Sequence, residues 1–278
     1  MNFVLMGSAG YIAPKHIKAI KDVSGRLIAT LDPHDSMGIL DSYFPGCKHF
    51  TEFEIFDRFC SRQDVDYVSI CSPNYLHDAH CRFGLRLGAN VICEKPLVLN
   101  ERNLDGLLDM QDRYQKKINC ILQLRLNEDL IQLRKKMQES PPVGHSSLIY
   151  FTPRGEWYRH SWKGDIAKSG GIIFNIGVHL FDLICWLFGP HVGFKVNTTD
   201  DTVTGTVYFV DAVVDFELSI NRYNLPTRAL NIDGNEYQFS NGFTDLHTKS
   251  YQEILAGNGF GVEDVRQSIR LCGRLRDG

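Results

Sequence analysis

The chain opens with an alternation of short apolar runs and amphipathic stretches. Apolar residues three and four positions apart predict helices at 11–21, 76–87 and 101–115. Between them lie short, continuously apolar runs, which are typical of a parallel sheet covered on both faces. The strands predicted in this first part are 2–6, 26–31, 66–71, 90–93 and 117–124.

The pattern changes after position 124, where strands follow one another closely. In the segment 212–220, Val214, Phe216 and Leu218 alternate with Asp215 and Glu217. Such alternation indicates a half-solvated antiparallel sheet, and hence a second domain of α+β type. We therefore place one domain at 1–124 and another at 125–278. The strands predicted in the second are 146–152, 202–210, 212–220, 228–233 and 236–240.

Composition and charge argue against several classes of protein. The 278 residues include 30 Lys+Arg and 33 Asp+Glu, a net charge of −3, with no basic run. This offers no electrostatic footprint for a nucleic acid polymer. No apolar stretch approaches the roughly 20 residues needed to span a membrane. Residues 1–10 lack the charged start of a signal peptide. We therefore expect no membrane partner and no export.

The eight cysteines lie singly and form no C-x-x-C pair. They are Cys47, Cys60, Cys71, Cys81, Cys93, Cys120, Cys185 and Cys272. Cys71, Cys93 and Cys185 sit in apolar runs, where a thiol behaves as a small hydrophobic group. This usage favours a reducing, cytoplasmic location over a disulfide framework, and it predicts no metal site.

A turn rich in small residues, Gly7-Ser8-Ala9-Gly10-Tyr11-Ile12-Ala13, joins the first predicted strand to the first predicted helix. Small residues there let the backbone approach a pyrophosphate. The spacing G-x-x-G-x-x-A is one residue off the usual fingerprint and also suits an ordinary tight turn. Asp32 ends the second strand, where a carboxylate binds both ribose hydroxyls and repels a 2′-phosphate.

These features predict an α/β protein with an N-terminal Rossmann domain for NAD, preferred over NADP, and a C-terminal α+β domain. We expect cofactor contacts from Gly7, Ala9, Gly10, Tyr11, Ile12 and Asp32.

Two further motifs follow later strands. Cys71-Ser72-Pro73-Asn74-Tyr75-Leu76-His77 comes after one strand, and Cys93-Glu94-Lys95-Pro96-Leu97 after the next. Both lie at the carboxyl ends of parallel strands, the edge where such sheets bind ligands. A third block contains Gly170-Gly171 and Asn175-Ile176-Gly177-Val178-His179, followed by Asp182. Together the blocks resemble the signature of the Gfo/Idh/MocA oxidoreductases, S/T-P-N-x-x-H followed by E-K-P.

The resemblance spans the whole chain, including an open, mostly antiparallel sheet in the second domain. It implies that Glu94 and Lys95 reach the nicotinamide ribose and the reacting carbon. It also implies that the adenosine and nicotinamide ribose side is lined by Ser72, Pro73, Asn74 and His77. Without the family, Ser-Pro-Asn is ordinary turn chemistry and Glu94-Lys95-Pro96 merely ends a strand.

The third block carries two stripes at helical spacing. A core stripe is predicted at Ile173, Ile176, Leu180, Leu183 and Leu187. On another face, Asn175 and His179 are stacked one turn apart, followed by Asp182 and Trp186. We expect Asp182 to fix the tautomer of the His179 imidazole. A lone histidine on such a helix is more often structural, but flanking Asn and Asp favour acid–base work.

Further segments resemble a narrower group of the family, the bacterial UDP-N-acetyl-D-glucosaminuronate 3-dehydrogenases of lipopolysaccharide O-antigen synthesis. These segments are 10–16, 123–125, 155–163 and 242–248. In that group the sugar 3-hydroxyl is oxidised with NAD, and NADH is reoxidised by 2-oxoglutarate. The resemblance implies a homotetramer built on the open sheets. It also adds Gln123 and Trp162 to the cofactor contacts.

The segment 154–163 suits such a substrate, because UDP and a uronate are anionic. It holds the basic residues Arg154, Arg159, His160 and Lys163 among aromatic side chains. Arg and Lys bind pyrophosphate or carboxylate, and aromatic faces pack on sugar or base rings. A solvated loop with incidental charge is the alternative. We expect substrate contacts from Lys95, Arg154, Tyr158, Arg159, Ser161, Lys163, Asn175 and His179.

Hydride removal from a secondary alcohol requires a base for the hydroxyl proton. We assign His179 as this base, with Lys95 holding the oxygen, and the sequence leaves the reverse assignment open. Rival functions are a family member acting on another sugar or cyclitol, a silent NAD-binding regulator and a scaffolding protein. The connections at 62–63, 200–201 and 224–227 are shorter than the family implies.

Overall fold

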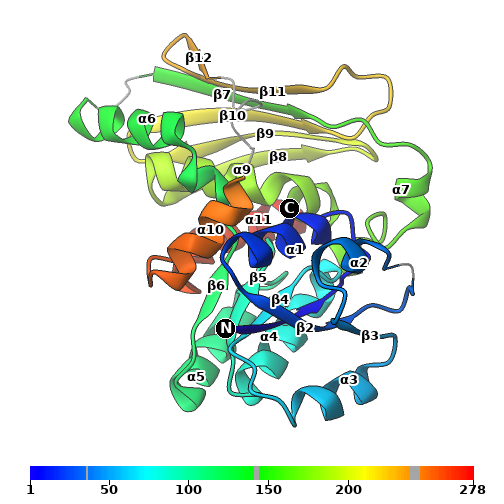
Figure 1. The fold of residues 1–278 in the computed structure, drawn as a ribbon. Helices are drawn as coiled ribbons and strands as arrows, with labels where there is room; N and C mark the ends of the chain where they lie inside the picture. Colours follow the sequence, from blue (N-terminus) through cyan, green and yellow to red (C-terminus); the bar gives the residue numbers. More distant parts are fainter. Residues whose placement is uncertain (36, 141–143, 238–244) are drawn as a thin grey trace. The chain divides into compact units, whose positions relative to one another are not determined.

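The computed structural model describes residues 1–278 except 36, 141–143 and 238–244. The chain divides into two compact units (Figure 1). Unit 1 consists of Met1–Val98, Arg102–Ile121 and Asp245–Val265. Unit 2 consists of Leu99–Glu101, Leu122–Thr244 and Arg266–Gly278.

The predicted boundary after residue 124 lies close to the division between Ile121 and Leu122. The structure differs from two contiguous ranges mainly because 245–265 belongs to unit 1. This segment carries α10 (Leu246–Leu255), which buries Tyr251 and Ile254 in the same hydrophobic cluster as Ile17 and Ile20. A buried apolar face, rather than position along the chain, decides where this helix packs.

Unit 1 contains a six-stranded, all-parallel sheet of order β3-β2-β1-β4-β5-β6. Its strands are β1 (Asn2–Met6), β2 (Arg26–Leu31), β3 (Lys48–Phe50), β4 (Tyr67–Ile70), β5 (Asn90–Cys93) and β6 (Ile118–Cys120). The strand order reverses beside β1, and ligands bind at the carboxyl ends of strands at such a point. β3 was not predicted, because it has three residues and none is fully buried.

The helices of unit 1 flank this sheet. They are α1 (Ala13–Asp22), α2 (Ile39–Tyr43), α3 (Phe53–Cys60), α4 (His77–Arg86), α5 (Arg102–Tyr114) and α10, with short turns η1 (Asn74–Leu76) and η4 (Glu263–Val265). α1 turns Ala13, Ile17 and Ile20 inward, which is the face that its apolar spacing predicted. They pack against Phe3 and Leu5 of β1, and this contact sets the helix start beside the glycine turn.

Unit 2 contains a six-stranded sheet of order β12-β11-β7-β10-β9-β8. Only the β10–β7 pair is parallel among the described pairings, which confirms the predicted mostly antiparallel sheet. The strands are β7 (Gly144–Phe151), β8 (His191–Thr198), β9 (Thr202–Phe209), β10 (Ala212–Ser219), β11 (Thr227–Ile232) and β12 (Asn235–Tyr237). Residues 238–240 of the last predicted strand lie outside the described residues.

The alternation of β10 is confirmed, since Val214, Phe216 and Leu218 are buried while Asp215 and Glu217 are half-exposed. β8 was not predicted, because none of its residues is fully buried and no apolar period results. The helical elements of unit 2 are η2 (Gln123–Leu126), α6 (Glu128–Glu139), α7 (Trp157–His160), α8 (Ile166–Ser169), η3 (Ile173–Gly177), α9 (Val178–Phe188) and α11 (Arg266–Asp277).

The expectation that no apolar stretch approaches the length needed to span a membrane is wrong. Ile166–Phe188 is helical and long enough to cross a membrane, with a mean hydropathy of 1.8 over its most apolar window. However, 61% of that window is buried inside the protein, as in the core helix of a folded domain. The apolar composition of this segment therefore serves the core of unit 2.

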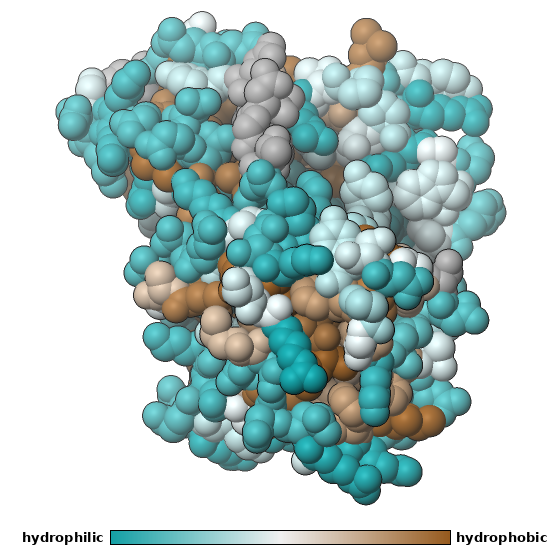
Figure 2. All heavy atoms as spheres, viewed as in Figure 1, coloured by the Kyte–Doolittle hydropathy of each residue, from teal (hydrophilic) through white to brown (hydrophobic). Residues whose placement is uncertain are grey.

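Several large hydrophobic side chains are exposed to solvent. Tyr11 is 91% exposed, Leu225 82% and Val210 74%. Figure 2 shows a face made mostly of hydrophilic residues with smaller apolar groups among them. Scattered exposed apolar side chains are normal for a folded protein and mark no site by themselves.

Candidate functional site

Gly7 shapes the turn between β1 and α1. Its φ of +83° lies in the region that favours glycine, and a Cβ there would lie 2.4 Å from the backbone nitrogen of Ser72. The backbone N–H of Gly7 donates to the carbonyl of Leu31 at 2.8 Å. Ser8 Oγ is buried and forms no hydrogen bond with any described residue. Bare backbone and a spare hydroxyl at a helix start fit a pyrophosphate.

Asp32 lies directly after β2 and is 7% exposed. Its Oδ2 accepts a hydrogen bond from the Ala9 backbone N–H at 3.0 Å, and its Oδ1 accepts one from the His34 N–H at 3.0 Å. The carboxylate therefore links the end of β2 to the glycine turn. The predicted cofactor residues Tyr11 and Ile12 lie at the start of α1, at the same end of the sheet.

His77 joins the two later motifs. Its Nδ1 lies 2.7 Å from the carbonyl oxygen of Pro96, and its Nε2 lies 2.7 Å from that of Ser72. Burial lowers the pKa of this ring, and the two carbonyl bonds oppose that shift. Both ring nitrogens thus lie against main-chain carbonyls, and a neutral ring donates its one N–H to one of them. His77 supports the cofactor edge by holding these two turns together.

Ser72 and Asn74 are buried in the first of these turns, beside the half-buried Pro73. Ser72 Oγ lies 2.8 Å from His80 Nδ1. Burial, with the neighbouring His77, lowers the pKa of His80 to about 4. A neutral His80 therefore supports the Ser72 hydroxyl at physiological pH.

Glu94 follows β5 and is 7% exposed. Its Oε1 accepts hydrogen bonds at 2.9 Å from Nε2 of His16 and from Nε2 of His247. Burial raises the pKa of Glu94, but these two bonds bring it well below its ordinary value. The histidines were not predicted as site residues. Two signals were available: His16 lies on the apolar face of α1, between Ala13 and Ile17, and both histidines belong to the segments 10–16 and 242–248 of the narrower resemblance.

Two predicted substrate residues are in direct contact in unit 2. The side-chain amide of Asn175 donates to the hydroxyl of Tyr158 at 2.6 Å, and Tyr158 is 3% exposed. Burial raises the pKa of Tyr158, and the Asn175 bond and the charge of Arg154 oppose that shift. Arg154 Nε is buried and forms no hydrogen bond within the described chain. A guanidinium with a spare donor beside this pair suits a carboxylate.

Lys163 lies close to two tryptophans of the same segment. Its Nζ is 4.9 Å from the ring centroid of Trp162 and 5.6 Å from that of Trp157. Its backbone N–H donates to Ser161 Oγ at 3.3 Å, which fixes the turn after α7. Arg159 is exposed. The basic residues of 154–163 therefore divide between packed and solvated positions.

His179 lies in the first turn of α9, directly after the π-type turn η3. Its ring meets the edge of Tyr150, with centroids 5.4 Å apart and planes at 87°. Gly177, two residues earlier, packs closely against Leu218 of β10, since a Cβ at position 177 would lie 2.7 Å from Leu218 Cδ1. The predicted core stripe is confirmed by the burial of Ile173, Ile176, Leu180, Leu183 and Leu187.

Asp182 has a role that the sequence did not predict. Its Oδ2 and Oδ1 accept hydrogen bonds from Nε and Nη2 of Arg125 at 2.9 and 2.8 Å. Both side chains are buried, and Ser268 Oγ donates to Oδ1 at 3.2 Å. This carboxylate therefore serves a buried ion pair between η2 and α9, and its predicted effect on the His179 tautomer stays a prediction.

The predicted residues divide between the units. The turns at Gly7, Ser72 and Glu94, together with Asp32, lie at one edge of the unit 1 sheet. Lys95 also belongs to unit 1, whereas Gln123, Trp162 and every other predicted substrate residue belong to unit 2. Residues 242–244 of the segment 242–248 lie outside the described residues.

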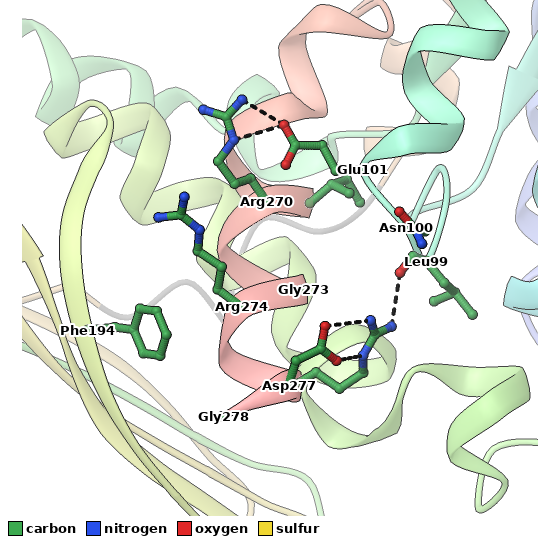
Figure 3. A pocket seen from close by; sticks show the side chains of 11 residues that line it. Leu99, Asn100, Glu101, Phe194, Arg270, Gly273, Arg274, Asp277 and Gly278 are labelled. Carbon is green, nitrogen blue, oxygen red and sulfur yellow. Dashed lines mark hydrogen bonds and ion pairs between the residues drawn. The ribbon is translucent and has the colours of Figure 1, made fainter.

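A cavity of about 560 Å³ in unit 2 contains none of the predicted residues (Figure 3). Arg270 Nε and Nη2 reach Glu101 Oε1 at 2.8 and 2.6 Å. Arg276 donates to the carbonyl of Leu99 at 3.0 Å and pairs with Asp277. Figure 3 shows these side chains turned toward their partners along α11. The cavity is therefore lined by charge that is largely compensated, and we assign no chemistry to it.

Comparisons with known proteins match both parts of the chain. Residues 1–122 match the model of the Gfo/Idh/MocA oxidoreductase family, described as an NAD-binding Rossmann fold. Residues 143–239 match the Gfo/Idh/MocA C-terminal domain. The expected cofactor, NAD, is therefore confirmed as the cofactor of the matching family.

Solved structures of a Thermus thermophilus dehydrogenase, WlbA (WbpB), superpose over 99% of this chain and 94% of theirs. One, in complex with NAD and alpha-ketoglutarate, is 42% identical with a TM-score of 0.96. Another, in complex with NAD and UDP-GlcNAcA, is 41% identical with a TM-score of 0.95. A curated relative, the 2,7-anhydro-N-acetylneuraminate hydratase of Mediterraneibacter gnavus, is 26% identical over 68% of this chain. The match spans only half of that relative's own length.

Proposed function

The chain belongs to the Gfo/Idh/MocA family of NAD-binding oxidoreductases, and from that premise we propose that it oxidises a UDP-linked uronate. The substrate is UDP-N-acetyl-D-glucosaminuronate, and the product is its 3-keto sugar. In this proposal 2-oxoglutarate is the second substrate and leaves as 2-hydroxyglutarate. The pathway is bacterial O-antigen sugar synthesis.

The observation that carries this proposal is the anion-suited group in unit 2. Asn175 and Tyr158 form a 2.6 Å hydrogen bond, and the charge of Arg154 acts on the same hydroxyl. Polar and basic side chains gathered in one place favour a substrate with matching oxygens over an apolar one. A uronate and 2-oxoglutarate each carry a carboxylate, so one basic group can serve both in turn. The ligands of the 42% and 41% identical structures support this choice.

The chain's own groups also suit the cofactor. Gly7 presents unobstructed backbone, Ser8 keeps a buried hydroxyl to donate, and Asp32 ends β2 with a carboxylate for a ribose. When bound, NAD takes a hydride from a secondary alcohol and, once reduced, returns it to the keto group of 2-oxoglutarate. The negative charge of Asp32 opposes a 2′-phosphate, so the proposal specifies NAD.

We assign the proton steps to two side chains. His179 accepts the proton of the sugar 3-hydroxyl as the hydride leaves, and the imidazolium later gives a proton to the keto oxygen of 2-oxoglutarate, which becomes the hydroxyl of 2-hydroxyglutarate. The Lys95 ammonium donates a hydrogen bond to the same oxygen and stabilises its developing negative charge. The edge contact with Tyr150 limits how the His179 ring turns.

Assembly and location follow from the same proposal. One face of β10 carries Val213, Asp215 and Glu217, all half-exposed, so the sheet has a side free for another subunit. We propose a homotetramer formed through such faces. All eight cysteines are free thiols, and most are buried, which suits a reducing cytoplasm.

The test is turnover with UDP-N-acetyl-D-glucosaminuronate, followed by mass spectrometry of the nucleotide sugar. A loss of two hydrogens, with one 2-hydroxyglutarate formed per keto sugar, is the expected result. UDP-N-acetylglucosamine, glucose and myo-inositol are the comparison substrates. Oxidation of a free sugar or cyclitol at an equal or higher kcat/KM would refute the proposed substrate in favour of another family reaction.

A further inference from the structure

Four distant parts of the chain meet in a buried polar network in unit 1. Glu94 follows β5, Ser69 lies on β4, His16 on α1, and His247 and Tyr251 on α10. Ser69, His16 and Tyr251 are 0% exposed, His247 4% and Glu94 7%. Five polar side chains kept from water at one place require mutual hydrogen bonds.

The distances give the order of these bonds. Glu94 Oε1 lies 2.9 Å from Nε2 of His16 and 2.9 Å from Nε2 of His247. His16 Nδ1 lies 2.8 Å from the Tyr251 hydroxyl, which lies 2.7 Å from Ser69 Oγ. The rings of His16 and His247 meet edge to face at 5.1 Å, so both imidazoles approach one oxygen from different sides.

One arrangement of protons satisfies every member with neutral rings. An ionised carboxylate only accepts, so each Nε2 carries the hydrogen that it donates to Glu94. His16 Nδ1 is then an acceptor and receives the Tyr251 O–H, and the Ser69 O–H donates to the Tyr251 oxygen. Burial lowers the pKa of His16, in agreement with a neutral ring.

The second carboxylate oxygen of Glu94, Oε2, accepts a hydrogen bond from the main chain. The backbone N–H of Lys95 donates to Glu94 Oε2 at 3.3 Å. One oxygen is therefore anchored to α1 and α10, and the other receives the backbone of the next residue. The conformation of the turn after β5 depends on a carboxylate that two helices hold in place.

A second, outer set of bonds fastens α10 to α1. Lys18 Nζ reaches Asp22 Oδ2 at 2.6 Å and Asp245 Oδ1 at 3.1 Å. Thr248 Oγ1 donates to Asp22 Oδ2 at 2.7 Å. These exposed contacts contribute little stability, and they link the N-terminal end of α10 to α1 on the solvent side. The helix is a separate segment of unit 1 in the sequence, and this network gives it a role.

We propose that His16 and His247 are positioning residues that hold the Glu94 carboxylate, and through it the Lys95 backbone, for the reaction. The inference rests on the role of Lys95 in the proposed function. It assigns a purpose to two histidines and a tyrosine that touch neither substrate nor cofactor in that proposal. It also predicts that α10 affects turnover more than cofactor affinity.

The first test exchanges donors at position 247. His247→Leu removes the donor, whereas His247→Gln returns an amide N–H to about the place of Nε2. We expect His247→Leu to lower kcat by roughly 10- to 100-fold, with the KM for NAD changed by less than about threefold. His247→Gln is expected to recover kcat to within about fivefold of the wild type. Tyr251→Phe, which removes one hydroxyl, should give a smaller loss and provides a result if His247→Leu fails to fold.

The control is Ile254→Val, which perturbs packing on the same helix without touching the network. If His247→Leu and Ile254→Val lower kcat equally, or if His247→Gln rescues nothing, the positioning role is refuted. A role limited to folding would lower the amount of active protein and leave kcat per folded enzyme unchanged.

The second test needs no substrate and so stands apart from the proposed function. ¹⁵N NMR of histidine-labelled protein is expected to show two neutral rings protonated at Nε2, and Glu94→Gln should shift both signals. Amide hydrogen exchange in the peptide that contains Lys95 should quicken in His247→Leu and not in Ile254→Val. The three ligand atoms of His16, Glu94 and His247 lie within 4.8 Å of one another. Stoichiometric bound metal, or an imidazolium signal at neutral pH, would overturn the network.

If the wild type turns over no UDP-uronate while the NMR and exchange results hold, the proposed function fails and the network survives. If the wild type is active and these results fail, the network alone is refuted.

Discussion

Replacing Asp182 by Asn tests the buried ion pair of unit 2. The carboxylate accepts two hydrogen bonds from Arg125, at 2.9 and 2.8 Å, and one from Ser268 at 3.2 Å. The side chains of Arg125 and Asp182 are 8% and 3% exposed. Asn keeps the volume but removes the charge, so the guanidinium stays buried without its counter-ion.

The cost follows from that burial. Removing one partner of a buried pair costs about 3–5 kcal/mol, because the remaining charge is desolvated and uncompensated. Replacing both partners by apolar residues of similar size is often neutral, so Arg125→Met with Asp182→Leu should be less destabilised than Asp182→Asn alone. We therefore expect the double variant to be more stable than the single variant, although it carries more substitutions.

Tryptophan fluorescence during urea unfolding is the assay. The three tryptophans, Trp157, Trp162 and Trp186, all belong to unit 2, so the signal reports the unit that contains the pair. We expect a lower unfolding midpoint for Asp182→Asn and kcat near the wild-type value at temperatures where unit 2 is folded. A loss below about 1 kcal/mol would refute the reasoning, since that is the range of an exposed pair. If kcat also fell about 100-fold, Asp182 would instead act on the His179 imidazole.

Three further predictions concern the cofactor, pH and the proton steps. Asp32→Asn keeps one oxygen for the two loop N–H groups that now bind separate carboxylate oxygens, and it removes the charge that repels a 2′-phosphate. It should raise the ratio of kcat/KM for NADP to that for NAD by about tenfold or more; an unchanged ratio would contradict this role. Burial and the neighbouring His77 lower the pKa of His80 from 6.5 to about 4, so the unfolded chain binds a proton first as pH falls. The contribution of the neutral His80 ring to the free energy of unfolding should thus be complete above pH 6.5. As the pH falls toward 4, urea titrations should show the free energy of unfolding decline by up to roughly 1.4 kcal/mol per pH unit. The same slope in His80→Gln would count against this. Lys95→Ala and His179→Ala should each lower kcat by at least about 100-fold while NAD still binds, as measured by steady-state kinetics and calorimetry; normal turnover in either would remove that residue from the mechanism.

Much of the fold could be predicted where a single period dominates the sequence. The continuous apolar runs of β1, β2 and β5 gave their bounds directly, and β10 alternates with a period of two. β8 lacks any fully buried residue, and α10 packs against α1, a helix that is distant from it in the sequence. Local periodicity contains no information about such placements.

The candidate site shows a similar limit. The turns at Gly7, Ser72 and Glu94 could be placed at one sheet edge, because parallel strands end together. The partners of the buried polar groups could not be predicted. Asp182 binds Arg125 of a distant segment, and Glu94 binds His247 from α10. Pairings of this kind depend on tertiary packing, which brings together side chains with no shared spacing.

The most direct test of the account follows one hydrogen atom. UDP-N-acetyl-D-glucosaminuronate with deuterium at C3 is incubated with the protein and 2-oxoglutarate, and the products are weighed by mass spectrometry. The account predicts a 3-keto sugar without the label and 2-hydroxyglutarate that carries one deuterium, because the same bound cofactor takes and returns the hydride. Unlabelled 2-hydroxyglutarate, or label retained in the sugar, would contradict it.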